Sequence, residues 1–292
     1  MLARRLDSAI IHPSRRIYIG QEQTFNFPRA KTHRLKGGSP LFKIAFLQDL
    51  GSGRLRIEEQ MLKAEFERRG TPVVLYTLKR IQRRNLPLSF DSFIAGDMDA
   101  MHGAMSQLEI DVPPPNDYPV SLTPFLCRRV WKSTLGDIER HVVDEAVPPV
   151  FVKPSARRKN FTGRVLGLSN DSMQIGPVSR SQEVWCSEVV TWKSEYRVYV
   201  IDDSIVGVAH YSGDADVALD LRVVQKALAA YRLSGEAPSA YGIDFGVLDT
   251  GESALIEAND GYALGAYEIA ARPYTDLLVR RWQELLQTER AL

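Results

Sequence analysis

The sequence predicts a mixed α/β fold that is divided into more than one lobe. Between residues 41 and 108, strand-like apolar runs alternate with helix-like segments, which indicates a parallel sheet with helices on its faces. The second half is richer in strands, and it contains a predicted hairpin over residues 241–262. At 292 residues, the chain is long enough for two or three compact lobes that each have a core.

The composition is typical of a soluble globular protein, with 44% hydrophobic and 25% charged residues. No apolar run approaches the ~20 residues needed to cross a bilayer, so no membrane partner is expected. Residues 1–16 lack the apolar core of a secretory signal. The two cysteines, Cys127 and Cys186, are too few for a disulfide framework. We therefore expect a cytoplasmic protein.

Residues 1–40 are predicted to be a basic arm that precedes the first strand. Residues 1–43 contain nine Lys or Arg and two Asp or Glu, a net charge of +7. Such an arm could contact nucleic acid or another anionic partner, and it could equally be a solvated leader.

Residues 41–120 are predicted to form a small α/β lobe. Its expected strands cover 41–47, 73–78 and 93–95, and its expected helices cover 57–69 and 98–108. The glycine-containing turn at 49–53 lacks the Lys-Ser/Thr of a phosphate loop, which favours an ordinary turn. The proline-rich residues 111–124 predict an unstructured link, and a helix is predicted over 125–143.

A lysine and a basic loop open the second half. Val150–Pro154 is a predicted strand, and the ammonium group of Lys153 near its end is suited to a phosphate. The following loop, residues 155–164, carries several basic residues, Lys159 among them, as well as Gly163. It could fold over a triphosphate as a lid, or it could be an ordinary charged hairpin.

Two strands are predicted next, at 184–190 and 195–201. The backbone of the first could pair with the edge of adenine, while the Glu188 side chain meets the ribose. In the second strand, Arg197 shares a face with Glu195. Its guanidinium group could bind a phosphate or carboxylate, or it could form a cross-strand salt bridge.

The predicted hairpin brings three oxygen-bearing side chains together. With a side-chain period of 2, Glu257 and Asn259 share one strand face, and Asp244 can meet them if the hairpin closes over residues 249–251. Two carboxylates and an amide oxygen are suitable ligands for Mg²⁺. The alternative is an acidic hairpin face in contact with solvent.

The order of these features resembles the ATP-grasp family over residues 125–267, about half of the chain. Asp-Phe-Gly-Val at 244–247 and Glu-Ala-Asn at 257–259 look like the metal-binding end of that fold. The segments FVKP and SEYRVYV are similar to the bacterial and phage clade named for an arginine and two lysines. The resemblance implies two α+β lobes that hold ATP between them, at residues 121–190 and 191–292, preceded by a small Rossmann-like lobe.

The resemblance also implies a function and a set of site residues. A family member of this kind would be an ATP-dependent ligase that forms an amide or peptide bond through an acyl phosphate, with ATP and Mg²⁺ as cofactors. Its Mg²⁺ would be held by Asp244, Glu257 and Asn259, and Lys153 and Arg197 would be catalytic. A kinase acting on a hydroxyl or nucleic-acid substrate, and a non-catalytic ATP-binding protein, remain alternatives.

The remaining expectations concern nucleotide, substrate and partner contacts. The residues expected to bind ATP are Lys153, Lys159, Gly163, Glu188, Val189, Val190, Lys193 and Arg197, with Lys132 and Arg129 as alternatives for a second basic contact. The expected substrate contacts, for a small-molecule or peptide acid and amine, are Arg129, His210 and Asp214. The helix predicted at 275–289 has an apolar stripe around Trp282, which could pack in the core or form a homodimer surface.

Overall fold

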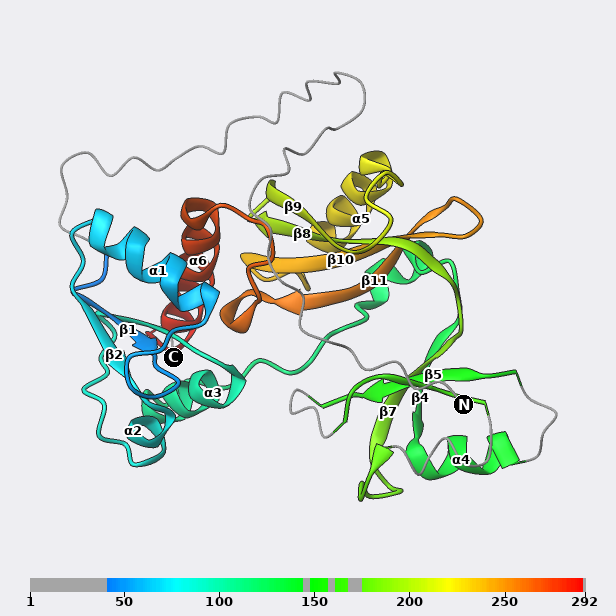
Figure 1. Ribbon diagram of the computed structural model, residues 1–292, viewed down its shortest axis with the longest axis horizontal. Helices are drawn as coiled ribbons and strands as arrows, with labels where there is room; N and C mark the ends of the chain where they lie inside the picture. The colour runs from blue at the N-terminus through cyan, green and yellow to red at the C-terminus, as the bar shows by residue number, and fades with distance from the viewer. Residues whose placement is uncertain (1–40, 144–147, 157–160, 168–174, 291–292) are drawn as a thin grey trace.

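A computed structural model describes residues 41–143, 148–156, 161–167 and 175–290. The described chain forms a three-stranded sheet and two four-stranded sheets, with helices packed against them, which confirms the predicted mixed α/β class (Figure 1). The basic arm at residues 1–40 lies outside the described residues, so its contact with nucleic acid stays a prediction. Among the described residues, none of the helices combines the length and hydrophobicity needed to span a membrane.

The first sheet is parallel and has the strand order β2-β1-β3. It contains β1 (Ile44–Gln48), β2 (Val73–Tyr76) and β3 (Ser92–Ala95), with helices α1 (Ile57–Arg68), α2 (Leu78–Gln82) and α3 (Met98–Gln107). The strands are short apolar runs and the helices follow them in the predicted alternation, which is the arrangement of a βαβ unit. Only α2 was not expected.

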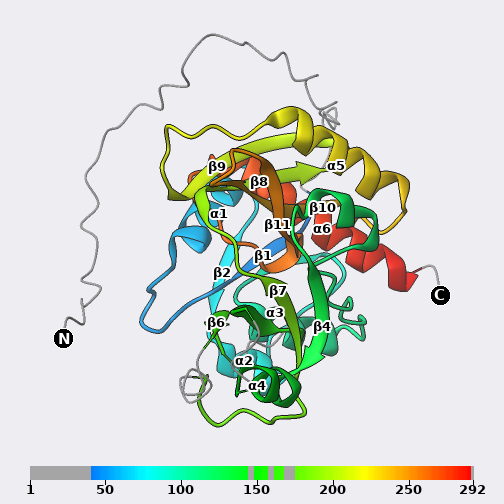
Figure 2. The same ribbon diagram turned by 90° about the vertical axis from the view of Figure 1, so that its right-hand side faces the viewer.

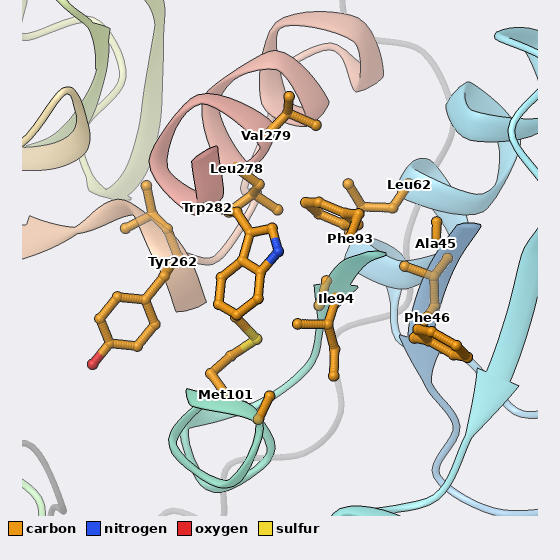
Figure 3. Packing of buried hydrophobic residues seen from close by; sticks show 14 of the residues in the cluster. Ala45, Phe46, Leu62, Phe93, Ile94, Met101, Tyr262, Leu278, Val279 and Trp282 are labelled. Carbon is orange, nitrogen blue, oxygen red and sulfur yellow. The ribbon is translucent and has the colours of Figure 1, made fainter. Parts of the chain in front are cut away.

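The C-terminal helix completes the core of this first lobe. Helix α6 (Ala271–Arg290) lies beside α1 in Figure 1. The indole of Trp282 is 1% exposed and lies near Phe93, Ile94 and Met101 in Figure 3, and its Nε1 donates a hydrogen bond to the Ser92 carbonyl oxygen at 2.9 Å. The apolar stripe of this helix is therefore used for core packing within the chain, which removes the argument for a homodimer surface.

The second sheet is antiparallel and carries the predicted hairpin. Its order is β11-β10-β8-β9, formed by β8 (Trp192–Ile201), β9 (Ser204–Gly213), β10 (Ala240–Leu248) and β11 (Ser253–Asp260). Helix α5 (Leu221–Leu233) covers one face, where Val224 and Tyr231 pack against Phe245. The alternate residues of the strands point to the other face, which packs in part against α6 and also carries the site.

The third sheet is also antiparallel and follows the order β4-β7-β5-β6. Its strands β4, β6 and β7 are labelled near α4 in Figure 2. It contains β4 (Val130–Thr134), β5 (Val150–Pro154), β6 (Arg164–Leu166) and β7 (Glu183–Glu188), with helix α4 (Leu135–Val143) packed against it. Strand β5 has the predicted bounds. The third sheet precedes residue 190 and the second sheet follows it, while the division into domains at 120 and 190 stays a prediction.

Two sequence predictions in this region were wrong. The helix predicted over 125–143 begins only at Leu135, because residues 130–134 pair with β7 as a strand. Val130, Trp131 and Thr134 are residue types that favour a half-buried strand, and in this segment that preference outweighs the helical pattern. The predicted unstructured link at 111–124 contains most of a 3₁₀ helix (Val120–Phe125), and its Asp117 carbonyl oxygen accepts a hydrogen bond from Ala258 N at 2.8 Å.

Candidate active site

A cleft of about 790 Å³ lies where the second and third sheets meet the link before the 3₁₀ helix. Its walls include Pro154 from β5, Asp117 from the link, and Glu257 from β11. The predicted residues Arg197, Asp244 and Asn259 line the same cleft. Several side chains predicted to act on ATP therefore share one cavity, although they come from separate parts of the chain.

The hairpin places its polar side chains on one face, as predicted. Asp244 pairs with Glu257 across the two strands, and Gly242 pairs with Asn259. A β-bulge after Asp244 absorbs one extra residue on β11. Asn259 Nδ2 donates a hydrogen bond to Asp244 Oδ2 at 3.2 Å. Two carboxylates directly opposite each other destabilise a sheet, so a compensating cation is required for each.

Arg197 supplies the cation for Asp244. The two residues are cross-strand neighbours on β8 and β10, and Arg197 donates from Nε at 2.8 Å and from Nη2 at 2.7 Å to the two carboxylate oxygens. Their side chains are only 9% and 4% exposed. Burial raises the pKa of Asp244, and the hydrogen bonds from Arg197 oppose that rise. Of the two alternatives for Arg197, the cross-strand salt bridge is the one observed.

Lys153 supplies the cation for Glu257 and joins two sheets. Its Nζ lies 2.5 Å from Glu257 Oε2 and 2.7 Å from Asp117 Oδ2, and it stands 4.5 Å from the centre of the Tyr118 ring. Burial alone would lower the pKa of Lys153, but Glu257, Tyr118 and Asp117 together raise it above its ordinary value. The lysine is therefore a permanent ammonium group, held directly behind two carboxylates that line the cleft, Asp117 and Glu257.

Asp117 and Tyr118 were missed because they lie in the link predicted to be unstructured. Besides contacting Lys153, Tyr118 packs edge-on against Trp185 of β7, with ring centres 4.9 Å apart. The sequence signal was an aromatic residue between prolines, since a large ring in a link is usually buried against something.

Two further tyrosines were also missed. The guanidinium carbon of Arg197 lies 4.8 Å from the centre of the Tyr267 ring. The Tyr267 ring also stacks on Tyr211, with an interplanar angle of 14°. Tyr211 donates a hydrogen bond to Glu195 Oε2 at 3.1 Å. The backbone of Tyr267 has a φ of +36°, an unfavourable value for a non-glycine residue, and such values concentrate at functional sites.

The structure places His210 away from the cleft. A β-bulge between Glu195 and Tyr196 shifts the pairing with β9, so that His210 pairs with Tyr196 on the face covered by α5. Tyr211 takes the cleft side instead. An alternating pattern cannot reveal a bulge, so the sequence did not indicate which of the two residues lines the cleft, and a substrate contact by His210 stays a prediction.

Among the described residues, the other two predicted substrate contacts, Asp214 and Arg129, do not line the cleft. Asp214 follows β9, and its backbone N–H donates to the Lys193 carbonyl oxygen at 2.8 Å. Arg129 is exposed and packs over the Trp131 ring at 4.5 Å. The Lys193 side chain is likewise exposed. A role in substrate or nucleotide binding stays a prediction for each of them.

The predicted adenine-binding segment begins at the end of β7. Glu188 Oε2 accepts a hydrogen bond from Arg129 N at 2.9 Å, so its carboxylate holds two strands together. Val189 and Val190 follow the strand rather than belonging to it, because β7 ends at Glu188. These three residues are not among the described residues that line the cleft, and their contact with a nucleotide stays a prediction.

The predicted lid loop is described only in part, and Lys159 lies outside the described residues. Gly163 precedes β6, and a Cβ there would lie 2.5 Å from Cζ of Phe151. The Phe151 ring therefore packs closely on this glycine and would have to shift to admit a side chain, while a lid role of Gly163 stays a prediction.

The donor set of the hairpin fits a magnesium ion better than a metal that needs a full protein cage. Within the described part of the chain, no three His, Cys, Asp or Glu side chains are grouped to hold a metal. Asp244, Glu257 and Asn259 instead offer two carboxylates and an amide. Mg²⁺ keeps several waters and binds substrate phosphates, so few protein ligands suffice.

Comparison with known proteins agrees with this geometry. Residues 125–277, just over half of the chain, match the ATP-grasp domain of family 2 in the clade named for one arginine and two lysines. D-alanine–D-alanine ligase from Bacillus anthracis complexed with ATP has a similar structure, with 13% identity, a TM-score of 0.54, and coverage of 86% of this chain and 99% of that chain. At this identity the likeness concerns the fold alone.

Two other solved structures are similar in the same way. D-cycloserine synthetase DcsG has 13% identity and a TM-score of 0.50, covering 85% of this chain and 99% of that chain. The ATP-grasp ligase PsnB complexed with minimal precursor has 14% identity and a TM-score of 0.49, covering 82% of this chain and 99% of that chain. No sequence among the curated proteins matches this chain.

Proposed function

We propose that this chain is an ATP- and Mg²⁺-dependent ligase that joins a carboxylate to an amine. The premise is that the chain belongs to family 2 of the arginine-and-two-lysines clade of ATP-grasp domains. The observation that carries the proposal is that a guanidinium group, two carboxylates and an amide line one cleft, and that a buried lysine contacts one of those carboxylates. The residues concerned are Lys153, Arg197, Asp244, Glu257 and Asn259.

Asp244, Glu257 and Asn259 are the proposed ligands of Mg²⁺. When bound, the ion supplies a Lewis acid that neutralises charge on the phosphate oxygens. Asp244 and Glu257 are cross-strand neighbours that repel each other, and Arg197 and Lys153 offset that repulsion; a bound cation would offset it further.

Lys153 and Arg197 are the proposed electrostatic catalysts. The Lys153 ammonium group is buried and permanently charged, so it can bind a phosphate strongly in a site that excludes water. Arg197 uses Nε and Nη2 to hold Asp244, while its Nη1 faces Gly265 in the cleft. It thereby orients a proposed metal ligand and presents a charged N–H toward the space where the substrate would react.

In the proposed reaction, an oxygen of the substrate carboxylate bonds to the γ-phosphorus of ATP as the bond to ADP breaks. The amine nitrogen of the second substrate then bonds to the carbonyl carbon of the acyl phosphate. Inorganic phosphate leaves with the bonding electron pair, and the proton lost by the amine nitrogen passes to solvent or to the leaving phosphate. Positioning and charge stabilisation carry both steps.

No protein nucleophile is needed for this chemistry, and the cysteines are poorly suited to provide one. Burial raises the pKa of Cys186 to about 12, so it is a thiol at neutral pH. The pKa of Cys127 is also raised, by burial and then by the charge of Glu252.

The test is calorimetric titration of Mg²⁺-ATP into the wild type and into a variant with both Glu257→Ala and Asn259→Ala. Glu252→Ala, an exposed change in the turn of the same hairpin, is the matched control. We expect magnesium-dependent binding by the wild type and the control, and none by the double variant. A folded wild type that does not bind ATP would overturn the proposal, and a phosphorylated acceptor without an amide product would replace it by phosphotransfer.

A further inference from the structure

A second pocket of about 250 Å³ adjoins the first lobe. It lies beyond the carboxyl end of β3, between the start of α1 and the loop that follows β11. In open parallel sheets this edge, where neighbouring strands connect in opposite directions, is where ligands bind. The pocket is lined by Arg56, Glu58, Glu59, Leu62, residues 95–97 and 262–265, Tyr274 and Leu278.

Glu59 gives this pocket its chemical character. The residue is 3% exposed, and its Oε2 has no hydrogen-bond partner among the described residues. The nearest cation, Arg56 Nη1, lies 3.5 Å from the other oxygen, at the limit of a hydrogen bond. Burial raises the pKa of Glu59, and the charge of Arg56 offsets only part of that rise. A buried carboxylate oxygen without a donor is costly, so a ligand that donates to it would bind favourably.

The other charged groups of the pocket already have partners. Asp97 accepts hydrogen bonds from Ala100 N at 3.0 Å and from Arg56 Nη2 at 3.2 Å. Glu58 Oε1 accepts from Ala266 N at 3.3 Å. The pocket is lined by three carboxylates and one guanidinium group, so it carries more negative than positive charge. Among these carboxylates, Glu59 is the one with an oxygen that lacks a donor within the described residues.

The size and the rest of the lining limit the ligand. Leu62, Leu264 and Leu278 supply apolar walls. A volume of about 250 Å³ is below the range of pockets for drug-sized ligands, so it suits a small molecule or a single side chain. A primary ammonium group on a short apolar stem meets both requirements.

Gly265 connects this pocket to the cleft. The loop residues Ala263, Leu264 and Gly265 line both cavities. A Cβ on Gly265 would lie 3.7 Å from Glu58 Oε1 and 3.8 Å from Arg197 Nη1, so this glycine adjoins a carboxylate of the pocket and a guanidinium group of the cleft. A ligand in the pocket would therefore lie next to the residues proposed to act on the acyl phosphate.

We propose that this pocket binds the amine substrate of the ligase, with Glu59 Oε2 receiving its primary ammonium group, which gives one proton to solvent before the neutral nitrogen attacks the acyl phosphate. The proposal rests on the function proposed above, because the pocket is joined to the cleft of the proposed reaction by the shared residues 263–265. The structural alternative is that Glu59, at the third position of α1, only caps the helix by reaching back to its first backbone N–H groups. Capping can occupy one oxygen and leaves Oε2 unexplained.

The probe for the test is propylammonium chloride, added to the full chain while the melting temperature is measured by calorimetry. The neutral 1-propanol, sodium propionate and sodium chloride at equal ionic strength are the comparison solutes. The variants are Glu59→Gln, which keeps shape and removes charge, and Glu67→Gln, an exposed carboxylate change on the same helix. Mg²⁺-ATP binding is measured on every variant.

We expect propylammonium, and not the comparison solutes, to raise the melting temperature of the wild type and of Glu67→Gln, because it binds only the folded state. Glu59→Gln should lose this rise in melting temperature, because its affinity for propylammonium should fall about 10- to 100-fold. It should still bind ATP. An equal shift in Glu59→Gln, or an equal effect of 1-propanol, would overturn the pocket and leave the ligase standing. Conversely, a Glu59-dependent shift in a protein that binds no ATP would support a cation pocket and overturn its assignment to a ligase substrate.

If Glu59→Gln does not fold, Glu59→Asp decides the same question. It keeps the charge and retracts the oxygens by one methylene. The shift should then weaken several-fold if the carboxylate receives the ammonium group, and an unchanged shift would count against the proposal.

Discussion

Lys153 Nζ lies 2.5 Å from Glu257 Oε2, although β5 and β11 belong to different sheets. The two side chains are 10% and 19% exposed, so this ion pair is largely shielded from water. It links the lysine proposed to bind phosphate with a carboxylate proposed to bind the metal. The two charges therefore neutralise each other across the boundary between the sheets.

Replacing Lys153 should strongly reduce activity and weaken ATP binding. We expect Lys153→Met to lower kcat/KM about 100- to 1,000-fold, the effect of removing one preorganised charge from the transition state. Stability should also fall by about 3 kcal/mol, since Glu257 and Asp117 then lose their cation in a buried site. Lys226→Met, on the exposed side of α5, is the control, and equal kinetics in the two variants would argue against the assignment.

Asp117 should compete with ATP for the same ammonium group. Its carboxylate lies 2.7 Å from Lys153 Nζ, where a phosphate would need to bind. We expect Asp117→Asn to tighten ATP binding about 3- to 10-fold, because the competing charge is removed. Asp111→Asn, an exposed change in the same link, should leave the Kd unchanged. Weaker binding by Asp117→Asn would instead make Asp117 a positioning residue for Lys153.

Arg197 and Asp244 should behave as one unit in a double-mutant cycle. The pair is bidentate and buried, so Arg197→Lys cannot reproduce its geometry. Urea unfolding of both single variants and of Arg197→Lys with Asp244→Asn should reveal a coupling energy of about 1 to 3 kcal/mol. Additive effects would show that the two side chains stabilise the fold independently.

Glu65 should make stability depend on acid pH. Hydrogen bonds from Arg68 and then Arg69 hold the pKa of Glu65 at about 2, below its ordinary 4.5, against the opposing effect of burial. Because the folded pKa is the lower one, the stabilisation is fully present above pH 4.5 and is lost as the pH falls toward 2.

The measurement is the free energy of unfolding of the wild type and Glu65→Gln between pH 2 and pH 7. The difference should be about 1 to 3 kcal/mol near neutrality and should vanish at the acid end. Glu67→Gln, whose carboxylate pairs with Lys63 on the exposed surface, should follow the wild-type curve within about 0.5 kcal/mol. A difference that did not change with pH would contradict the linkage.

Trp282 should be the main anchor of the C-terminal helix to the first lobe. Trp282→Ala removes a fully buried indole and leaves the Ser92 carbonyl oxygen without its donor, so we expect a loss of about 3 to 5 kcal/mol. Arg272→Ala, an exposed change on the same helix, is the control for thermal unfolding. A variant of Trp282 that remained equally stable would mean that α6 docks without it.

The sequence by itself determined the parts of this protein that follow from local periodicity. The alternation along β10 and β11, with a turn between them, predicted that Asp244, Glu257 and Asn259 share one face. The apolar run ending near Lys153 predicted a strand with the observed bounds. A side-chain period of 2 holds for any regular strand, so the pattern is readable without knowing its neighbours.

Only the tertiary structure decided which distant segments meet at the cleft. The bulge that turns Tyr211 toward the site and His210 away is a property of the pairing between β8 and β9. Asp117 reaches Lys153 because the link packs against β11. Residues 130–134 became a strand because β7 offered them a partner. Each outcome depends on long-range packing and hydrogen bonding, which compete with local preference and leave no periodic signal in the sequence.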